Sequence, residues 1–221
     1  MKNLTVTCWN EQAENQYAYP EGIHKCIAGF LQGACCIGEV RTVSLDMPEQ
    51  GLPQEVLDTT DVLVYWGHAH HAKVTDETVR CIKNRVLDGM GLVLLHSAHA
   101  SKIFQTLMGT RTEKLAWRLQ ENEWEKVWKI EANHPVTRGV PDCIYIPQTE
   151  MYGEPFGIPA PDELLFISGY GQGEVFRSGC TYKRGAGNIF YFAPGHETYR
   201  IYDMPEIQQI IKNAVRWAAK R

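Results

Sequence analysis

The stretch Asp61-Val62-Leu63-Val64-Tyr65-Trp66-Gly67-His68-Ala69-His70-His71 decides the fold of this chain. Its first six residues form a near-continuous apolar run, typical of a strand buried on both faces of a parallel sheet. Residues 92–95 and 189–192 are further apolar strands that run into histidines. In an open α/β sheet, ligands bind outside the carboxyl ends of the strands. The sequence therefore predicts one polar pocket, catalytic or metal-binding, at that edge of the sheet.

Apolar residues recur with a helical period between these strands. After Pro20, one stripe with a 3.6-residue period comprises Ile23, Cys26, Ile27, Phe30, Leu31 and Ala34, and residues 207–218 repeat its spacing. Thr75 is expected to cap a third helix, and Gly89 to stop it. This alternation predicts an α/β fold in which helices sandwich a doubly wound, mainly parallel sheet.

The alternation changes between about residues 111 and 150, a stretch rich in tryptophan and charge. Residues 124–130 place large side chains at every second position, which indicates an antiparallel strand. Residues 174–182 and 188–192 are expected to form a hairpin. We interpret 111–150 as an excursion within a single domain of residues 1–221. Exposed tryptophans within residues 111–130 could form a subunit interface or a pocket lid.

Composition excludes several classes of partner. The chain has 221 residues, 44% of them hydrophobic, and a net charge of -4, without the basic patch of a nucleic-acid binder. No apolar run reaches the roughly 18 residues of a membrane span, and no signal peptide opens the chain. We therefore expect a cytoplasmic protein without nucleic-acid, membrane or nucleotide-cofactor binding. The seven scattered cysteines are expected to be free thiols.

Histidines in these strand-end motifs are candidate ligands. His68 and His71 could bind a metal, since neutral imidazole is a common zinc ligand, although solvated loop histidines are the alternative. His96-Ser97 stands where α/β hydrolases carry a nucleophile elbow. Ser97 is either a nucleophile or a helix cap beside an inward-pointing His96. His196 precedes Glu197, a carboxylate that could orient its tautomer.

Several charged and polar side chains are expected to lie near the histidines in the predicted pocket. Glu150 and Glu154 lie in a proline-bounded loop, where a carboxylate could serve as general base or metal ligand, or remain a solvated surface charge. Asn10 and Glu11 end the first strand at the same edge of the sheet. Arg177 could bind a substrate oxyanion or pair with one of these carboxylates.

Seven motifs spread over nearly the whole chain resemble the ThuA-like, trehalose-utilisation family. They are Val6-Thr7-Cys8-Trp9-Asn10-Glu11, Tyr19-Pro20-Glu21-Gly22-Ile23-His24, Trp66-Gly67-His68 with His71, Leu94-Leu95-His96-Ser97-Ala98-His99, Glu150-Met151-Tyr152-Gly153-Glu154, Val175-Phe176-Arg177-Ser178-Gly179 and Phe192-Ala193-Pro194-Gly195-His196-Glu197-Thr198. The resemblance implies a flavodoxin-like sandwich of the class I glutamine amidotransferase-like superfamily. It also implies a role in the use of disaccharides such as trehalose, beside a sugar-oxidising dehydrogenase.

The chain departs from the glutaminases of that superfamily at the elbow. Those enzymes carry a cysteine there, whereas this chain has His96-Ser97, and none of its cysteines falls at the elbow. Without a thiolate there is no thioester route, so we expect no glutaminase activity.

The leading hypothesis is metal-assisted proton transfer, isomerisation or cleavage on a keto-glycoside. The expected ligands of a divalent metal, zinc or manganese, are His68, His96 and His196. The candidates for proton transfer are His71, His99, Glu150 and Glu154. The candidate substrate contacts are Asn10, Glu11, Trp66, Tyr152 and Arg177.

Three alternatives stay open. Glu150 and Glu154 could carry out conventional two-carboxylate glycoside hydrolysis. Ser97 could be the nucleophile of a serine hydrolase, or the protein could be a non-catalytic sugar-binding or regulatory protein. A carbohydrate is the expected ligand in the leading and the non-catalytic readings, and the chain could form a homo-oligomer.

Overall fold

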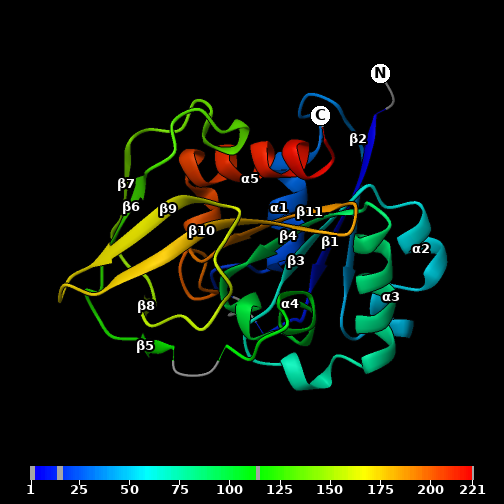
Figure 1. The fold of residues 1–221 in the computed structure, drawn as a ribbon, viewed down its shortest axis with the longest axis horizontal. Helices are drawn as coiled ribbons and strands as arrows, with labels where there is room; N and C mark the ends of the chain where they lie inside the picture. Colours follow the sequence, from blue (N-terminus) through cyan, green and yellow to red (C-terminus); the bar gives the residue numbers. More distant parts are fainter. Residues whose placement is uncertain (1–2, 14–16, 113–114, 221) are drawn as a thin grey trace.

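The computed structural model describes residues 3–13, 17–112 and 115–220, and Figure 1 shows its fold. Met1-Lys2, at the opening of the chain, and two positions of the excursion lie outside these residues. The described strands form a nine-stranded sheet in the order β2-β1-β3-β4-β11-β10-β9-β6-β7 and a separate β5-β8 pair. The predicted α/β fold is confirmed.

The strands are β1 (Leu4–Asn10), β2 (Ile37–Ser44), β3 (Val62–Trp66), β4 (Gly91–Leu95), β5 (Ala116–Arg118), β6 (Glu125–Lys129), β7 (Cys143–Ile146), β8 (Met151–Gly153), β9 (Glu163–Tyr170), β10 (Val175–Arg184) and β11 (Gly187–Phe192). The α-helices are α1 (Ile23–Leu31), α2 (Gln54–Asp58), α3 (Asp76–Leu87), α4 (Lys102–Met108) and α5 (Pro205–Ala218). Short 3-10 turns are η1 (Pro48–Gly51), η2 (His71–Lys73), η3 (His96–Ala100), η4 (Pro135–Thr137) and η5 (Ile201–Asp203).

The parallel half of the sheet comprises β2, β1, β3, β4 and β11. Successive side chains of β3 enter different cores, because neighbouring residues of a strand point to opposite faces. Val64 packs in the core that includes α1 and α5, and Leu63 in the core that includes α2, α3 and α4. Figure 1 shows α1 and α5 on one side of the sheet and α3 and α4 on the other. Both faces are covered, which explains why the strands are continuously apolar.

The antiparallel half adds β10, β9, β6 and β7 beyond β11. The predicted strand around residues 124–130 is β6, which pairs with β9 and with the edge strand β7. The predicted hairpin joins β10 to β11, with Arg184 opposite Gly187. The excursion therefore extends the main sheet and also supplies β5, which pairs with β8.

Helix boundaries follow local signals except at α1. The hydroxyl oxygen of Thr75 accepts a hydrogen bond from the Thr78 amide, so the predicted cap of α3 is confirmed. The start of α1 is Ile23 rather than the position after Pro20, because Gly22 adopts a φ of 94°, which is not helical.

All seven cysteines are free thiols, as the sequence predicted. Among the described residues, no helix combines the length and apolar character needed to cross a membrane.

Candidate functional site

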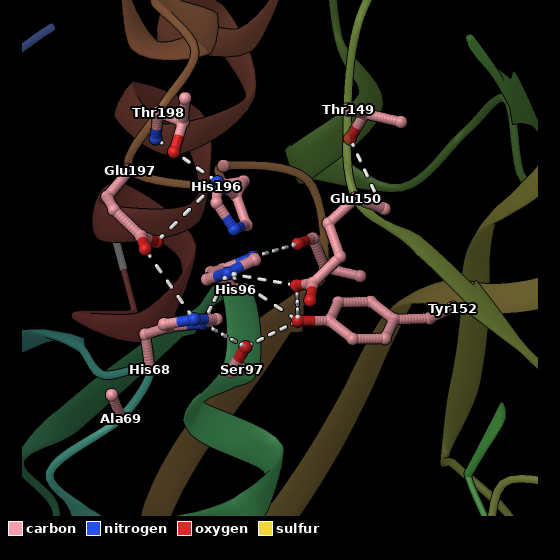
Figure 2. A network of polar contacts seen from close by, with 12 residues as sticks. His68, Ala69, His96, Ser97, Thr149, Glu150, Tyr152, His196, Glu197 and Thr198 are labelled. Atoms are coloured by element: carbon pink, nitrogen blue, oxygen red, sulfur yellow. Dashed lines mark hydrogen bonds and ion pairs between the residues drawn. The ribbon is translucent and has the colours of Figure 1, made fainter. Parts of the chain in front are cut away.

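The three histidine motifs converge at the carboxyl ends of adjacent parallel strands (Figure 2). His68 follows β3, His96 follows β4 and His196 follows β11, while Glu150 approaches from the segment before β8. One ligand atom from each of these four side chains lies within 4.8 Å of the others. We call these four residues the His/Glu cluster.

His96 occupies the strained position of the turn after β4. Its φ is 56°, in the left-handed region that costs energy for residues other than glycine. Its ring stacks on the indole of Trp66, with centroids 5.9 Å apart and planes inclined by 12°. His96 Nε2 lies 3.0 Å from His68 Nδ1. The strained turn therefore presents His96 to its neighbours in the cluster.

The loop that carries His68 is held by the carboxylate of Glu11. Glu11 Oε1 accepts hydrogen bonds from the backbone amides of His68, at 2.7 Å, of His70, at 3.0 Å, and of Ala69. Glu11 is buried at the end of β1, so these amides replace the water that would otherwise solvate its charge. Glu11 therefore positions the His68 loop, and its contact with a substrate stays a prediction.

Ser97 and Tyr152 link His68 to Glu150. Ser97 Oγ lies 2.9 Å from His68 Nδ1 and is also hydrogen-bonded to the Tyr152 hydroxyl. The Tyr152 hydroxyl donates to Glu150 Oε2 and lies 3.5 Å from His96 Nε2. A continuous chain of polar groups therefore crosses the site from His68 to Glu150 (Figure 2).

Glu197 lies beside two histidines of the cluster, His68 and His196. Its carboxylate oxygens lie 3.6 Å from His68 Nε2 and 3.7 Å from His196 Nδ1. The Thr198 amide donates to His196 Nδ1 at 3.1 Å, so the hydrogen of the neutral imidazole is on Nε2. The side chains of His196 and Glu197 therefore approach each other although the two residues are adjacent in sequence.

Burial sets the protonation of these groups. Desolvation lowers the pKa of His68, lowers that of His196 to about 4 and lowers that of His96 well below its ordinary value. The imidazole of His68 further lowers the pKa of both His96 and His196. Burial raises the pKa of Glu150 to about 7, against the opposing effect of its hydrogen bond from Tyr152. The histidines are therefore neutral at physiological pH, the form in which imidazole binds a metal.

A cavity of about 390 Å³ opens onto the His/Glu cluster. It is lined by His68, Ser97, His99, Ala100, Thr112, Leu115, Trp117, Glu150 and Tyr152. Ligand pockets are typically about 300–1,000 Å³ in volume. His99 is buried in its wall, and its Nδ1 lies 2.8 Å from the Tyr191 hydroxyl. Desolvation lowers the pKa of His99 to about 3.

Two of the predicted residues pair with each other outside the His/Glu cluster. Arg177 binds the Glu154 carboxylate through Nε at 2.7 Å and Nη2 at 3.0 Å, and also donates to the Phe156 carbonyl. Opposite charges and a matching bidentate geometry explain the pair. Both side chains are partly exposed. Of the two outcomes that the sequence left open for Arg177, the structure shows the ion pair.

Three further predicted residues take supporting positions. Trp66 is fully buried and donates to the Gly195 carbonyl at 3.1 Å, so its indole supports the turns and has no surface for a sugar to stack on. Asn10 is buried beside His24, with 3.1 Å between its amide nitrogen and the imidazole Nδ1. His71 Nδ1 lies 3.8 Å from Glu11 Oε2, behind the His68 loop.

Trp117, one of the tryptophans for which the sequence left a subunit interface or a pocket lid open, lines the cavity. It lies on β5 opposite Tyr152 of β8, so pairing between distant segments brings it to the cavity. The Trp-rich composition of the excursion was a signal, but a strand of three residues is too short for periodicity to show where its side chains face.

Comparisons with known proteins identify the family. The family model ThuA, described as trehalose utilisation, matches residues 5–218. The chain belongs to the ThuA family. A ThuA-like protein from Parabacteroides merdae shares 17% identity over 99% of this chain and 90% of its own, with a TM-score of 0.72. A ThuA-like protein from Bacteroides uniformis shares 16% identity over 97% and 91%, with a TM-score of 0.69.

The fold of this ThuA-family chain extends to more distant structures. PurLQS from Thermotoga maritima shares 12% identity over 98% of this chain and 99% of the matched chain, with a TM-score of 0.58. These likenesses show the class I glutamine amidotransferase-like fold predicted from the sequence. A comparison with curated proteins found no match.

Proposed function

We propose that this ThuA-family protein is a metal-dependent enzyme that moves a proton on a keto-glycoside, leading to isomerisation or cleavage. The family description, trehalose utilisation, supports a carbohydrate substrate. The observation that carries the proposal is the convergence of His68, His96 and His196 with Glu150, a cluster of which His68 and Glu150 also line a ligand-sized cavity.

The donor set fits a divalent metal such as zinc or manganese. Three neutral imidazoles from separate turns would be the ligands, as in catalytic zinc sites that keep one position open. To bind through Nε2, His196 would move its hydrogen to Nδ1 and give up the hydrogen bond from the Thr198 amide. His96 Nε2 and His68 Nδ1 face each other at 3.0 Å, so at most one of them carries the hydrogen between them. A bound metal would supply a Lewis acid that polarises a substrate carbonyl.

The protein's own groups would handle the proton. Glu150 faces the cavity and has a pKa of about 7, which suits a general base near neutral pH. Its hydrogen bond from Tyr152, which in turn contacts Ser97, provides a path by which the site can hold or release a proton. His99 lines the same cavity and is the second candidate for proton transfer. Glu154 is a weaker candidate for proton transfer than His99, because its carboxylate is paired with Arg177.

The first test is metal content of the purified protein by plasma mass spectrometry, comparing wild type with His96→Ala and His196→Ala. We expect near-stoichiometric zinc or manganese in the wild type and loss of metal in both variants. His134→Ala is the matched control, since His134 is also a buried histidine but contacts Glu163 and Trp217 instead of the cluster. Metal-free wild type, prepared without chelators, would refute the proposal, as would retention of metal by both variants.

Glu150→Gln separates the two roles open to Glu150. If Glu150 is the base, the variant keeps its metal and loses turnover, because the amide cannot accept the proton. If Glu150 is instead a metal ligand, metal content falls along with turnover.

A serine hydrolase is the second candidate, and one specific observation favours it. Ser97 Oγ, His68 and Glu197 stand in triad order, with 2.9 Å from the hydroxyl to Nδ1 and 3.6 Å from Nε2 to the carboxylate. His68 cannot be both a base for Ser97 and a metal ligand through the same nitrogen. Labelling of Ser97 by a serine-directed phosphonate would support this alternative, and metal bound at His68 would exclude it.

A non-catalytic sugar-binding protein is the third candidate. It predicts no bound metal and sugar affinity that survives substitution of the histidines. A cytoplasmic location, a homo-oligomer and a sugar dehydrogenase partner also remain predictions.

A further inference from the structure

Trp117 is a large apolar side chain left exposed beside the candidate site. It is 67% exposed although it lines the same cavity as His68, Ser97 and Glu150. Because Trp117 is exposed while the other end of the cavity is closed by buried groups, the indole stands at the cavity mouth. Exposed tryptophan in a pocket is typical of a binding surface rather than of a core.

Strand pairing fixes the direction of the indole. Trp117 of β5 lies directly opposite Tyr152 of β8 in an antiparallel pair, and residues directly opposite project from the same face. The Tyr152 hydroxyl reaches Ser97 and Glu150 at the closed end of the cavity. Trp117 therefore projects to the same side as a residue that contacts the His/Glu cluster.

The ribbon that carries Trp117 is anchored next to it. Arg118 Nε donates to Glu123 Oε2 at 2.8 Å, and Arg118 Nη1 contacts Glu174 Oε1. Glu123 is buried, so its charge is compensated by this guanidinium. This ion-pair network holds β5 in place, so the position of the indole is set before a ligand arrives.

The cavity is polar at its closed end and apolar at its mouth. The buried residues Ser97, Glu150 and Tyr152 present oxygen atoms to the cavity, whereas the half-buried Leu115 and the exposed Trp117 present apolar surface. A pyranose ring has the matching chemistry, because its C–H groups form an apolar face while its hydroxyls ring the edge. Flat aromatic side chains provide such a face with little loss of conformational entropy.

We propose that Trp117 is the stacking platform of a sugar subsite at the mouth of this cavity. One pyranose ring of a disaccharide would pack its C–H face on the indole, while polar groups of the sugar would face Ser97, Tyr152 and Glu150. This inference rests on the proposed carbohydrate function and adds a residue that sets affinity and specificity without taking part in the chemistry.

The test is calorimetric titration of metal-loaded protein with trehalose, maltose, sucrose and cellobiose. We expect Trp117→Ala to weaken the best-binding disaccharide by about tenfold or more and Trp117→Phe to keep most of the affinity. Trp128→Ala is the matched control, because Trp128 is 47% exposed but lies on β6 of the main sheet. Metal content is measured in parallel and should not change.

Each outcome separates the platform from the proposed function. If the wild type binds a disaccharide and Trp117→Ala binds it equally well, the platform is refuted while the proposed function stands. If Trp117→Ala changes only the oligomeric state, Trp117 belongs to a subunit interface and the platform is again refuted. If the wild type binds none of the four disaccharides, the platform is refuted as a disaccharide subsite, whereas the proposed function on a keto-glycoside is decided by its own metal-content test.

Discussion

Glu125→Gln should remove a pH-dependent loss of stability. Glu125 lies on β6 and is 1% exposed. Its carboxylate accepts hydrogen bonds from Ser168, from Thr149 at 3.2 Å and from Tyr170 at 3.3 Å. These bonds do not compensate for burial, which raises the pKa of Glu125 from 4.5 to about 7.

The direction of the effect follows from the two pKa values. The folded state holds the proton up to about pH 7, whereas the unfolded state releases it near pH 4.5. Stability from this group is therefore fully present below pH 4.5 and is lost as the pH rises to about 7. At about 1.36 kcal/mol per pH unit, the whole interval corresponds to about 3 kcal/mol. Between pH 5 and pH 8 the loss should be about 2 to 3 kcal/mol, since the unfolded state has released most of its proton at pH 5.

The assay is urea denaturation followed by tryptophan fluorescence at pH 5 and pH 8. The free energy of unfolding of the wild type should fall between these pH values by about 2 to 3 kcal/mol more than that of Glu125→Gln. Comparing the two proteins cancels the titration of the histidines and of Glu150, which both retain. Glu121→Gln, at an exposed position nearby, should follow the wild type. If Glu125→Gln and the wild type change in parallel, the buried carboxylate does not carry the charge-burial cost inferred here.

Two further substitutions test how the site is supported. Glu11→Ala removes the acceptor for the amides of His68 and His70, and should lower the free energy of unfolding by at least about 2 kcal/mol in thermal or chemical denaturation. It should also weaken metal binding by about 10- to 100-fold in a chelator competition, because the His68 loop loses its support. Arg177→Met breaks the partly exposed pair with Glu154, and should cost about 1 kcal/mol while metal content stays at the wild-type level. Loss of metal in Arg177→Met would show that the pair is coupled to the cluster.

Local patterns were sufficient for much of the fold. The apolar run of β3, the cap at Thr75 and the spacing that repeats in α5 depend on contacts within one element or on burial of one stripe. The start of α1 was misplaced because a positive φ at Gly22 depends on how the chain enters the helix, which Pro20 alone does not reveal.

The sequence by itself determined which residues stand at the ends of the parallel strands, and therefore that His68, His96 and His196 meet at one edge. Parallel strands place their carboxyl ends together whatever the side chains are. Only the tertiary structure decided what surrounds them. It turned Trp66 inward, used Glu11 to hold a loop and brought Tyr152 and Trp117 into the site through β5–β8 pairing. Those outcomes depend on register and packing between segments far apart in the chain, which no local period encodes.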